Sequence, residues 1–184
     1  MRIIAGEARG RKIETPAGLH TRPTLDRVRE NLFNMIQNNI PDSRVLDLFA
    51  GSGALSLEAL SRGASFAVMN DSDRNAFAVQ KNNIALLHYE ARTRQIHSDW
   101  RAALSLLQKE REMFDLIFLD PPYCMTDLRD VFCSVMPLVR EGTLIILEHE
   151  ADRQPQVAGN VREMKKRSWG FCAVTIYQFL SEGE

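Results

Sequence analysis

The fold is decided by the stretch Val45-Leu46-Asp47-Leu48-Phe49-Ala50-Gly51-Ser52-Gly53. A short apolar run with an acidic residue inside it leads into two glycines, and a segment of helical character follows and ends near Gly63. Glycines after a strand let the backbone come close to a ligand at the carboxyl end of that strand, where open α/β sheets bind their ligands. The stretch therefore predicts the first strand, loop and helix of such a sheet.

Strands and helices alternate downstream of this unit. Further strands are predicted at residues 66–69, 92–97, 114–119 and 143–147. Helical segments at 73–87, after Asp99 and up to about Val139 separate them, which is typical of right-handed βαβ units and a mostly parallel sheet. The tail differs, because residues 162–169 and 171–179 predict two strands with only Gly170 between them. We therefore expect a sheet that is parallel except at one edge.

Residues 1–41 precede the alternating pattern and form a small N-terminal extension. Arg9-Gly10-Arg11 predicts a short hairpin, and Thr24 is a candidate N-cap for the helix that follows. The apolar positions of this helix recur every three or four residues, at Leu25, Val28, Leu32, Met35 and Ile36. A chain of 184 residues can bury one substantial core, so we expect a single domain over residues 1–184.

Charge is distributed unevenly along a chain whose net charge is only -1. Residues 1–30 hold an excess of basic side chains, and the rest of the chain is acidic. A basic arm can bind a polyanion, although a solvated face of mixed charge is the alternative interpretation. The chain has no apolar run of membrane-spanning length, no signal-peptide pattern, and neither disulfide nor zinc spacing among its cysteines and histidines. We therefore expect a cytoplasmic protein without a metal.

Acidic residues at successive strand ends indicate the kind of ligand. A dinucleotide-binding loop has a third glycine where this chain has Ser56, which argues against NAD. Asp47 would repel a pyrophosphate but suits a cationic group, and S-adenosylmethionine carries an ammonium and a sulfonium. Asp71 is placed to accept hydrogen bonds from the ribose hydroxyls, and Asp99 from the adenine amino group. Taken singly, Asp71 and Asp99 could equally be helix N-caps or solvated turn residues.

Asp120-Pro121-Pro122-Tyr123 follows the predicted strand 114–119 directly. Prolines restrict the backbone and cannot donate hydrogen bonds, so their carbonyls stay available as acceptors. An aromatic amino group is a poor nucleophile. If the Asp120 carboxylate and the Pro121 carbonyl accept hydrogen bonds from its two N–H groups, its attack on a methyl donor is favoured. Tyr123 offers a face on which a base can stack. The alternative is a proline-stiffened turn in which Tyr123 packs.

These motifs, together with Met1–Gly6, Arg9-Gly10-Arg11 and Thr21–Asn34, resemble the RsmD family of 16S ribosomal RNA guanine-N2 methyltransferases. The resemblance spans essentially the whole chain. It implies a Rossmann-like class I methyltransferase fold, α/β, with a seven-stranded, mostly parallel sheet and an antiparallel C-terminal strand. It also implies S-adenosylmethionine as methyl donor and 16S ribosomal RNA or the small ribosomal subunit as partner. The family usually has Glu at the position of Asp71.

The resemblance assigns roles to particular residues. The predicted catalytic residues are Asp120, Pro121, Pro122 and Tyr123. The predicted donor-binding residues are Asp47, Phe49, Gly51, Gly53, Asp71, Asp99 and Trp100. The predicted RNA-binding residues, all within the extension, are Arg9, Arg11, Lys12 and Arg22.

Two other functions stay open at this level. Asp-Pro-Pro-Tyr alone is equally compatible with methylation of adenine N6 in DNA or RNA. A chain without a separate target-recognition domain favours a substrate whose own fold supplies specificity, such as ribosomal RNA. A non-catalytic RNA-binding or ribosome assembly factor could keep the same fold, but the intact Asp47, Gly51, Gly53 and Asp120 argue against it. Guanine N2 is thus an inference from the resemblance alone.

Overall fold

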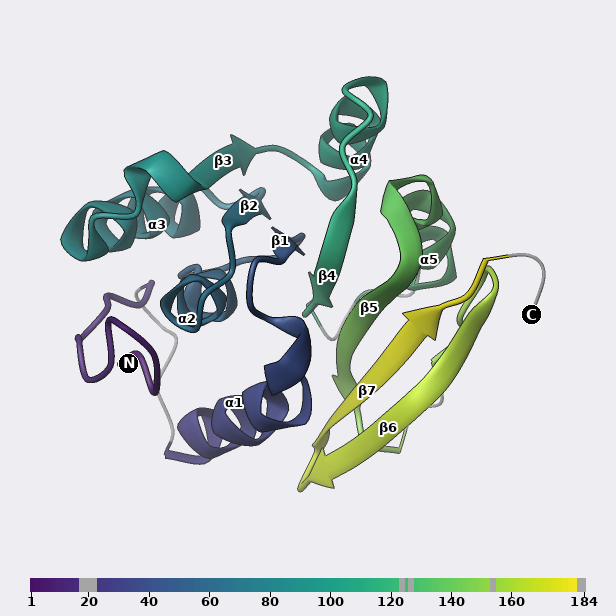
Figure 1. Ribbon diagram of the computed structural model, residues 1–184, viewed down its shortest axis with the longest axis horizontal. Helices are drawn as coiled ribbons and strands as arrows, with labels where there is room; N and C mark the ends of the chain where they lie inside the picture. Colours follow the sequence, from purple (N-terminus) through teal and green to yellow (C-terminus); the bar gives the residue numbers. More distant parts are fainter. Residues whose placement is uncertain (17–22, 123–124, 126–127, 153–154, 182–184) are drawn as a thin grey trace.

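The structure is a computed structural model that describes residues 1–16, 23–122, 125, 128–152 and 155–181. In that part of the chain one seven-stranded sheet has helices packed on both faces (Figure 1). The helices are α1 (Pro23–Met35), α2 (Ala54–Ser61), α3 (Arg74–Leu87), α4 (Trp100–Lys109) and α5 (Leu128–Val135). The strands are β1 (Arg44–Asp47), β2 (Phe66–Asp71), β3 (Thr93–His97), β4 (Phe114–Leu119), β5 (Val139–Glu150), β6 (Val161–Trp169) and β7 (Cys172–Phe179).

The strand order β3-β2-β1-β4-β5-β7-β6 confirms the predicted sheet. The strands β1 to β5 are parallel to one another, whereas β7 is antiparallel to both β5 and β6. The chain moves outward in one direction from β1 to β3 and in the other from β4 onward, so the switch point lies between β1 and β4. Open α/β sheets bind ligands at this point, outside the carboxyl ends of the strands.

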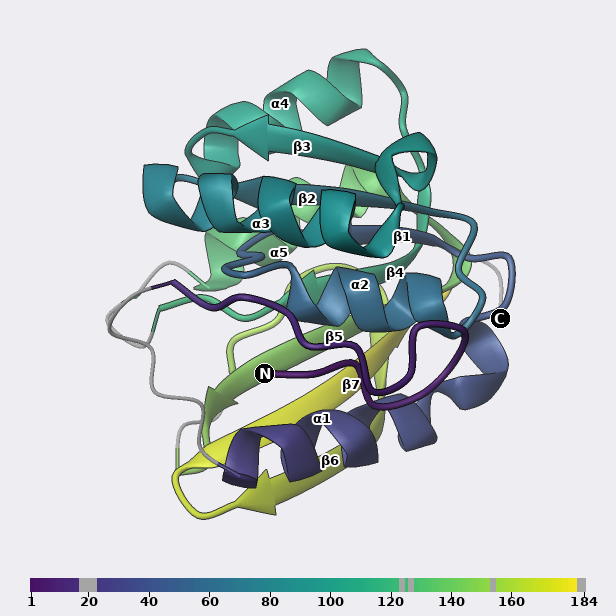
Figure 2. The same cartoon turned by 90° about the vertical axis from the view of Figure 1, so that its left-hand side faces the viewer.

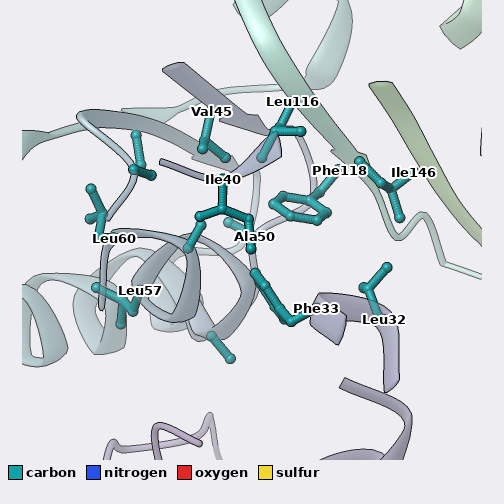
Figure 3. Close-up of a cluster of buried hydrophobic side chains, with 14 of the residues drawn as sticks. Leu32, Phe33, Ile40, Val45, Ala50, Leu57, Leu60, Leu116, Phe118 and Ile146 are labelled. Atoms are coloured by element: carbon teal, nitrogen blue, oxygen red, sulfur yellow. The ribbon is translucent and has the colours of Figure 1, made fainter. Parts of the chain in front are cut away.

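Two apolar clusters hold the helices against the sheet. On one face, side chains of α1 and α2 pack on alternate strand residues such as Leu116, Phe118 and Ile146 (Figure 3). Side chains of α3 belong to the same cluster. Phe33 of α1 lies fully buried there, with its ring centroid 5.8 Å from that of Phe118. On the other face, α4 and α5 pack on the intervening residues, for example Leu119. The alternation is the one expected of strands covered on both sides.

The N-terminal segment, residues 1–16, runs beside α2 (Figure 2). It forms the small hairpin that was predicted, with an antiparallel bridge between Arg2 and Lys12. Glu58 of α2 is fully buried and anchors the segment, because its carboxylate accepts hydrogen bonds from the backbone N–H groups of Ile4 at 2.7 Å and Ala5 at 3.0 Å. It also pairs with Arg62 at 2.7 Å. A buried carboxylate with three donors is a strong tether.

Two boundary predictions were wrong. Helix α1 begins at Pro23, so Thr24 lies inside the first turn and is not its N-cap. Proline suits the first helical position, because its ring presets φ and its missing N–H would have no helical partner there. Strand β5 extends from Val139 to Glu150, well beyond the predicted 143–147, because pairing with both β4 and β7 satisfies its backbone. The β4 prediction, 114–119, is confirmed to the residue.

Among the helices of the described residues, none has the length and apolar character needed to cross a membrane. Within the same ranges, no group of three or more His, Cys, Asp or Glu side chains is arranged to hold a metal ion.

Candidate active site

The loop after β1 has the backbone that its glycines predict. Gly51 and Gly53 have φ values of 53° and 78°, in the left-handed region that glycine tolerates. A Cβ on Gly53 would lie 2.9 Å from the sulfur of Met69, whereas a Cβ on Gly51 would meet nothing within 4 Å. Gly51 therefore borders open space, and Gly53 allows the loop to pack against β2 as it enters α2.

Buried side chains of α3 hold this loop, and the sequence analysis missed them. The side-chain amide of Gln80 donates to the Gly51 carbonyl at 3.1 Å, and that of Asn83 donates to the Ser52 carbonyl at 3.0 Å. Both residues are fully buried. Their three-residue spacing places them on one side of α3. The sequence signal that could have identified them is a pair of side-chain amides, three residues apart, on the helix that follows the second strand.

Asp47, at the end of β1, is 1% exposed and only partly satisfied. Its Oδ2 accepts a hydrogen bond from the Ser56 hydroxyl at 3.0 Å, whereas its Oδ1 has no partner. Burial raises the pKa of Asp47 to about 7, because the Ser56 hydrogen bonds only partly offset the loss of hydration and Asp71 adds repulsion. Ser56 thus has a positive role in orienting Asp47. An unpaired buried carboxylate oxygen is costly, so Oδ1 of Asp47 is an acceptor that a hydrogen-bond donor would stabilise.

The other two acidic strand ends are already engaged within the protein. The Asp71 carboxylate accepts hydrogen bonds from the N–H of Gly51 at 2.8 Å and from that of Asp73 at 2.9 Å. Asp99 is exposed and caps α4, accepting from the N–H of Arg101 at 2.9 Å. The N-cap interpretation of Asp99 is therefore confirmed. Contacts of Asp71 and Asp99 with a ribose and an adenine stay predictions.

The two aromatic residues of the predicted donor site lie in different places. Phe49 lines, beside Gly51, the pocket that also contains Asp120. Trp100 is 5% exposed and belongs to the apolar cluster under α4, so its ring packs in the core. The structure does not bring the Trp100 side chain into that pocket.

Asp120 and Glu148 are neighbours at the centre of the site. Leu119 of β4 pairs with Leu147 of β5, so the next residue on each parallel strand lies beside the other on the same face. Both carboxylates line one pocket. Asp120 is open to that pocket, yet the protein around it limits its hydration. This desolvation, followed by the charges of Glu148 and Asp47, raises the pKa of Asp120 well above its usual range. No local sequence pattern marks Glu148, because strand register alone brings it beside Asp120.

The pocket is open at the switch point and mixes apolar walls with a few charged groups. The glycine loop, α1, the N-terminal segment, β4 and β5 all contribute to it. Its lining includes Met1, Thr15, Val28, Arg29, Leu32, Phe49, Ala50, Gly51, Ser52, Asp120 and Glu148. The Arg29 guanidinium donates to the carbonyl of Arg2. The N-terminal extension is thus part of the pocket wall.

The prolines after Asp120 have unequal surroundings. Pro121 is buried and Pro122 is exposed, and both line a smaller adjoining pocket with Glu148. The Pro122 carbonyl accepts a hydrogen bond from the N–H of Met125 at 2.8 Å. The expectation that both proline carbonyls are open to substrate is therefore wrong for Pro122. Tyr123 lies outside the described residues.

Arg9 and Arg11, two of the predicted RNA-binding residues, do not lie at the pocket. Arg11 donates to the Leu86 carbonyl near the end of α3 at 2.7 Å. Arg9 and Arg11 line a surface hollow with Arg92, which precedes β3. Arg9 and Arg11 therefore lie at the amino ends of the parallel strands, whereas Asp120 lies at the carboxyl ends. Lys12 is exposed, and Arg22 lies outside the described residues.

Comparison with known proteins agrees with this geometry. The structure matches that of the Escherichia coli protein described as "Putative methyltransferase yhhF" with a TM-score of 0.88 and 35% identity, covering 99% of each chain. It also matches SMU.776, solved in complex with SAH, with a TM-score of 0.67 at 14% identity, covering 79% of this chain and 49% of that one. The fold is therefore that of the class I methyltransferases.

The particular family follows from sequence similarity. The family model described as "Conserved hypothetical protein 95" matches residues 1–178. The chain is 36% identical to Ribosomal RNA small subunit methyltransferase D of Escherichia coli strain K12, over 100% of this chain and 92% of that protein. It therefore belongs to this family, the RsmD family, as the resemblance predicted.

Proposed function

We propose that this protein transfers a methyl group from S-adenosylmethionine to the exocyclic N2 of a guanine in 16S ribosomal RNA, in the cytoplasm. The observation that carries the proposal is the position of Asp120, at the end of β4 in the pocket that the glycine loop also lines. The name of the Escherichia coli relative supports small-subunit ribosomal RNA as the substrate class.

The residues present fit the donor. The unpaired Oδ1 of Asp47 can accept a hydrogen bond from the donor's ammonium group. Asp47 and Asp120 both have raised pKa values, since desolvation by the surrounding protein and neighbouring carboxylates disfavour their charged forms. A ligand with two positive charges and no phosphate relieves this repulsion. When bound, S-adenosylmethionine supplies an electrophilic methyl group on its sulfonium.

Asp120 is suited to activate an amino group. Its carboxylate accepts a hydrogen bond from the amine and stabilises the positive charge that develops as nitrogen attacks the methyl carbon. The carbon–sulfur bond breaks as the carbon–nitrogen bond forms, and the amine proton leaves afterwards. The raised pKa makes Asp120 a competent acceptor for that proton.

Glu148 favours guanine over adenine. The Watson–Crick edge of guanine offers two adjacent donors, N1–H and the N2 amino group, whereas adenine has an acceptor at N1. Adjacent carboxylates on β4 and β5 match the two donors of guanine, with N2 at Asp120 and N1–H at Glu148. An adenine placed in the same way would direct its N1 lone pair at a carboxylate, which is repulsive.

The test is to identify the methylated nucleoside. Incubation with isotope-labelled donor and 16S ribosomal RNA, small subunits or DNA, followed by digestion, should give N2-methylguanosine from the RNA samples. N6-methyladenine would show that the base is wrong, and donor binding without transfer would favour a non-catalytic factor. Asp120→Ala should lower the transfer rate by about 100-fold or more while donor binding persists. Asp130→Asn, an exposed change on α5, is the matched control and should be active.

A further inference from the structure

The β6–β7 hairpin places basic side chains beside the catalytic edge of the sheet. Arg167 of β6 pairs with Val174 of β7, and Val174 pairs with Glu148 of β5. Paired residues on neighbouring strands point to the same face, so Arg167 lies on the Glu148 face with one strand between them, about 10 Å away. Lys165 follows the same pattern through Ile176.

Strand β6 is an exposed, basic edge strand. Arg162, Lys165, Lys166 and Arg167 are exposed, and Glu163 is the acidic residue among them. Within the residues that the structure describes, neither Lys165 nor Arg167 forms an ion pair. Charged edge strands also discourage pairing with other sheets. Protection of an edge strand would be served by charge of either sign. It does not explain why the exposed charges of β6 are mostly positive beside an acidic pocket.

An aromatic side chain stands at the tip of the same hairpin. Gly170 has a φ of 62° and occupies the first position of a two-residue turn, which suits the twist of a hairpin. The turn leaves Phe171 97% exposed, the most exposed large apolar side chain among the described residues. Because Cys172 pairs with Glu150, this tip lies at the carboxyl end of β5. Asp120 lies at the same end of the parallel strands.

We propose that the β6–β7 hairpin is an RNA-binding surface of this enzyme, in which Lys165 and Arg167 contact phosphates and Phe171 stacks on an unpaired base next to the target nucleotide. The inference rests on the proposed function for its choice of polymer. An unpaired base exposes an apolar face that an aromatic ring can cover, and the adjoining phosphates require cations. The hairpin offers both within reach of the pocket, whereas Arg9 and Arg11 lie at the opposite edge.

The experiment measures binding of a 16S ribosomal RNA transcript at several salt concentrations. Lys165→Ala with Arg167→Ala should reduce the slope of log affinity against log salt by about 1.4 to 1.8 units, since two phosphate contacts are lost. Phe171→Ala should weaken binding about 5- to 150-fold at fixed salt, with little change in slope. The matched control is Lys81→Ala with Lys109→Ala, two exposed lysines on α3 and α4.

Donor affinity, measured on the same variants, should equal that of the wild type and shows that the fold is intact. Photocrosslinking of the wild-type complex should in addition map RNA to residues 162–171. A double variant with the wild-type slope, or a control that loses as much, would overturn the proposal. So would crosslinks confined to other segments. Methyl transfer to RNA by the wild type is a separate readout, and its absence would contradict the proposed function instead.

Discussion

At the scale of single residues, the carboxyl groups of the candidate active site repel one another. Asp120 lies near both Glu148 and Asp47. Burial and then the charge of Asp71 raise the pKa of Asp47, whereas desolvation and then the charges of Glu148 and Asp47 raise the pKa of Asp120. Glu148 and Asp120 also contribute to raising the pKa of the Cys172 thiol, after burial, so this thiol stays protonated. In the proposed function this repulsion is relieved when the pocket receives a positively charged methyl donor and the hydrogen-bond donors of the base.

Replacing Glu148 tests how the base is chosen. In Glu148→Gln the side chain keeps its shape but can also donate, so it no longer opposes the N1 acceptor of adenine. We expect kcat/KM for the guanine substrate to fall about 10- to 150-fold, the value of one charge-assisted hydrogen bond. Discrimination against an adenine-substituted RNA should narrow. Glu90→Gln, an exposed change before β3, is the control; equal losses in both variants would contradict a role in recognition.

At the scale of elements, the N-terminal segment is part of the enzyme's framework. Asn83 of α3 holds both the Ser52 carbonyl and the backbone of Glu14, where its side chain donates to the carbonyl and accepts from the N–H. One amide therefore joins the glycine loop to the segment that leads to the pocket wall. We therefore expect a displacement of the N-terminal segment to change the affinity for the methyl donor.

Two glycines of the segment provide a matched test. Gly6 and Gly10 have nearly equal φ values, 84° and 81°, so alanine costs each about 1–2 kcal/mol of backbone strain. A Cβ on Gly6 would lie 1.8 Å from the Ser61 carbonyl oxygen, whereas a Cβ on Gly10 meets nothing within 4 Å. Gly6→Ala should therefore lower the free energy of unfolding more than Gly10→Ala and weaken donor binding. Urea unfolding and donor titration measure both; equal effects would show that the contact with α2 is dispensable.

At the scale of the whole molecule, the raised carboxyl pKa values link stability to pH. The folded-state pKa of Asp47, about 7, lies above its ordinary value of 3.8. Between these values the folded protein holds more protons than the unfolded chain, so stability falls as pH rises through this window. The raised pKa of Asp120 acts in the same direction. A bound cationic donor opposes the trend, because it favours the charged carboxylates.

Asp47→Asn isolates this contribution. The variant should be more stable than the wild type at pH 8, by at most about 4 kcal/mol, and the difference should shrink toward pH 4. It should also lose the stabilisation by saturating donor, about 2.7 kcal/mol at 100 times Kd. Urea unfolding at several pH values, with and without S-adenosylmethionine, measures both effects. A variant with wild-type pH dependence would show that Asp47 does not carry the linkage.

The sequence predicted the elements of the sheet more reliably than their ends. Strand β4 was placed to the residue, because a continuous apolar run bounded by Asp120 leaves little choice. The extent of β5 was underestimated, because its outer residues are held by pairing with β7, which a local pattern does not contain. The N-cap prediction for α1 is wrong for a local reason: Thr24 suits an N-cap, but the preceding Pro23 suits the first helical position and the helix begins there.

The sequence by itself determined the class of chemistry. The spacing of Asp47, Gly51 and Gly53 after a strand, and Asp120 before two prolines, is local information, because strand ends and glycine turns are set by neighbouring residues. Only the tertiary structure decided which distant residues meet. Glu148 lies beside Asp120 because of the register between β4 and β5. Strand β6 lies near both because β7 pairs antiparallel with β5 and with β6. Such pairings depend on packing between segments far apart in the chain, which no local pattern encodes.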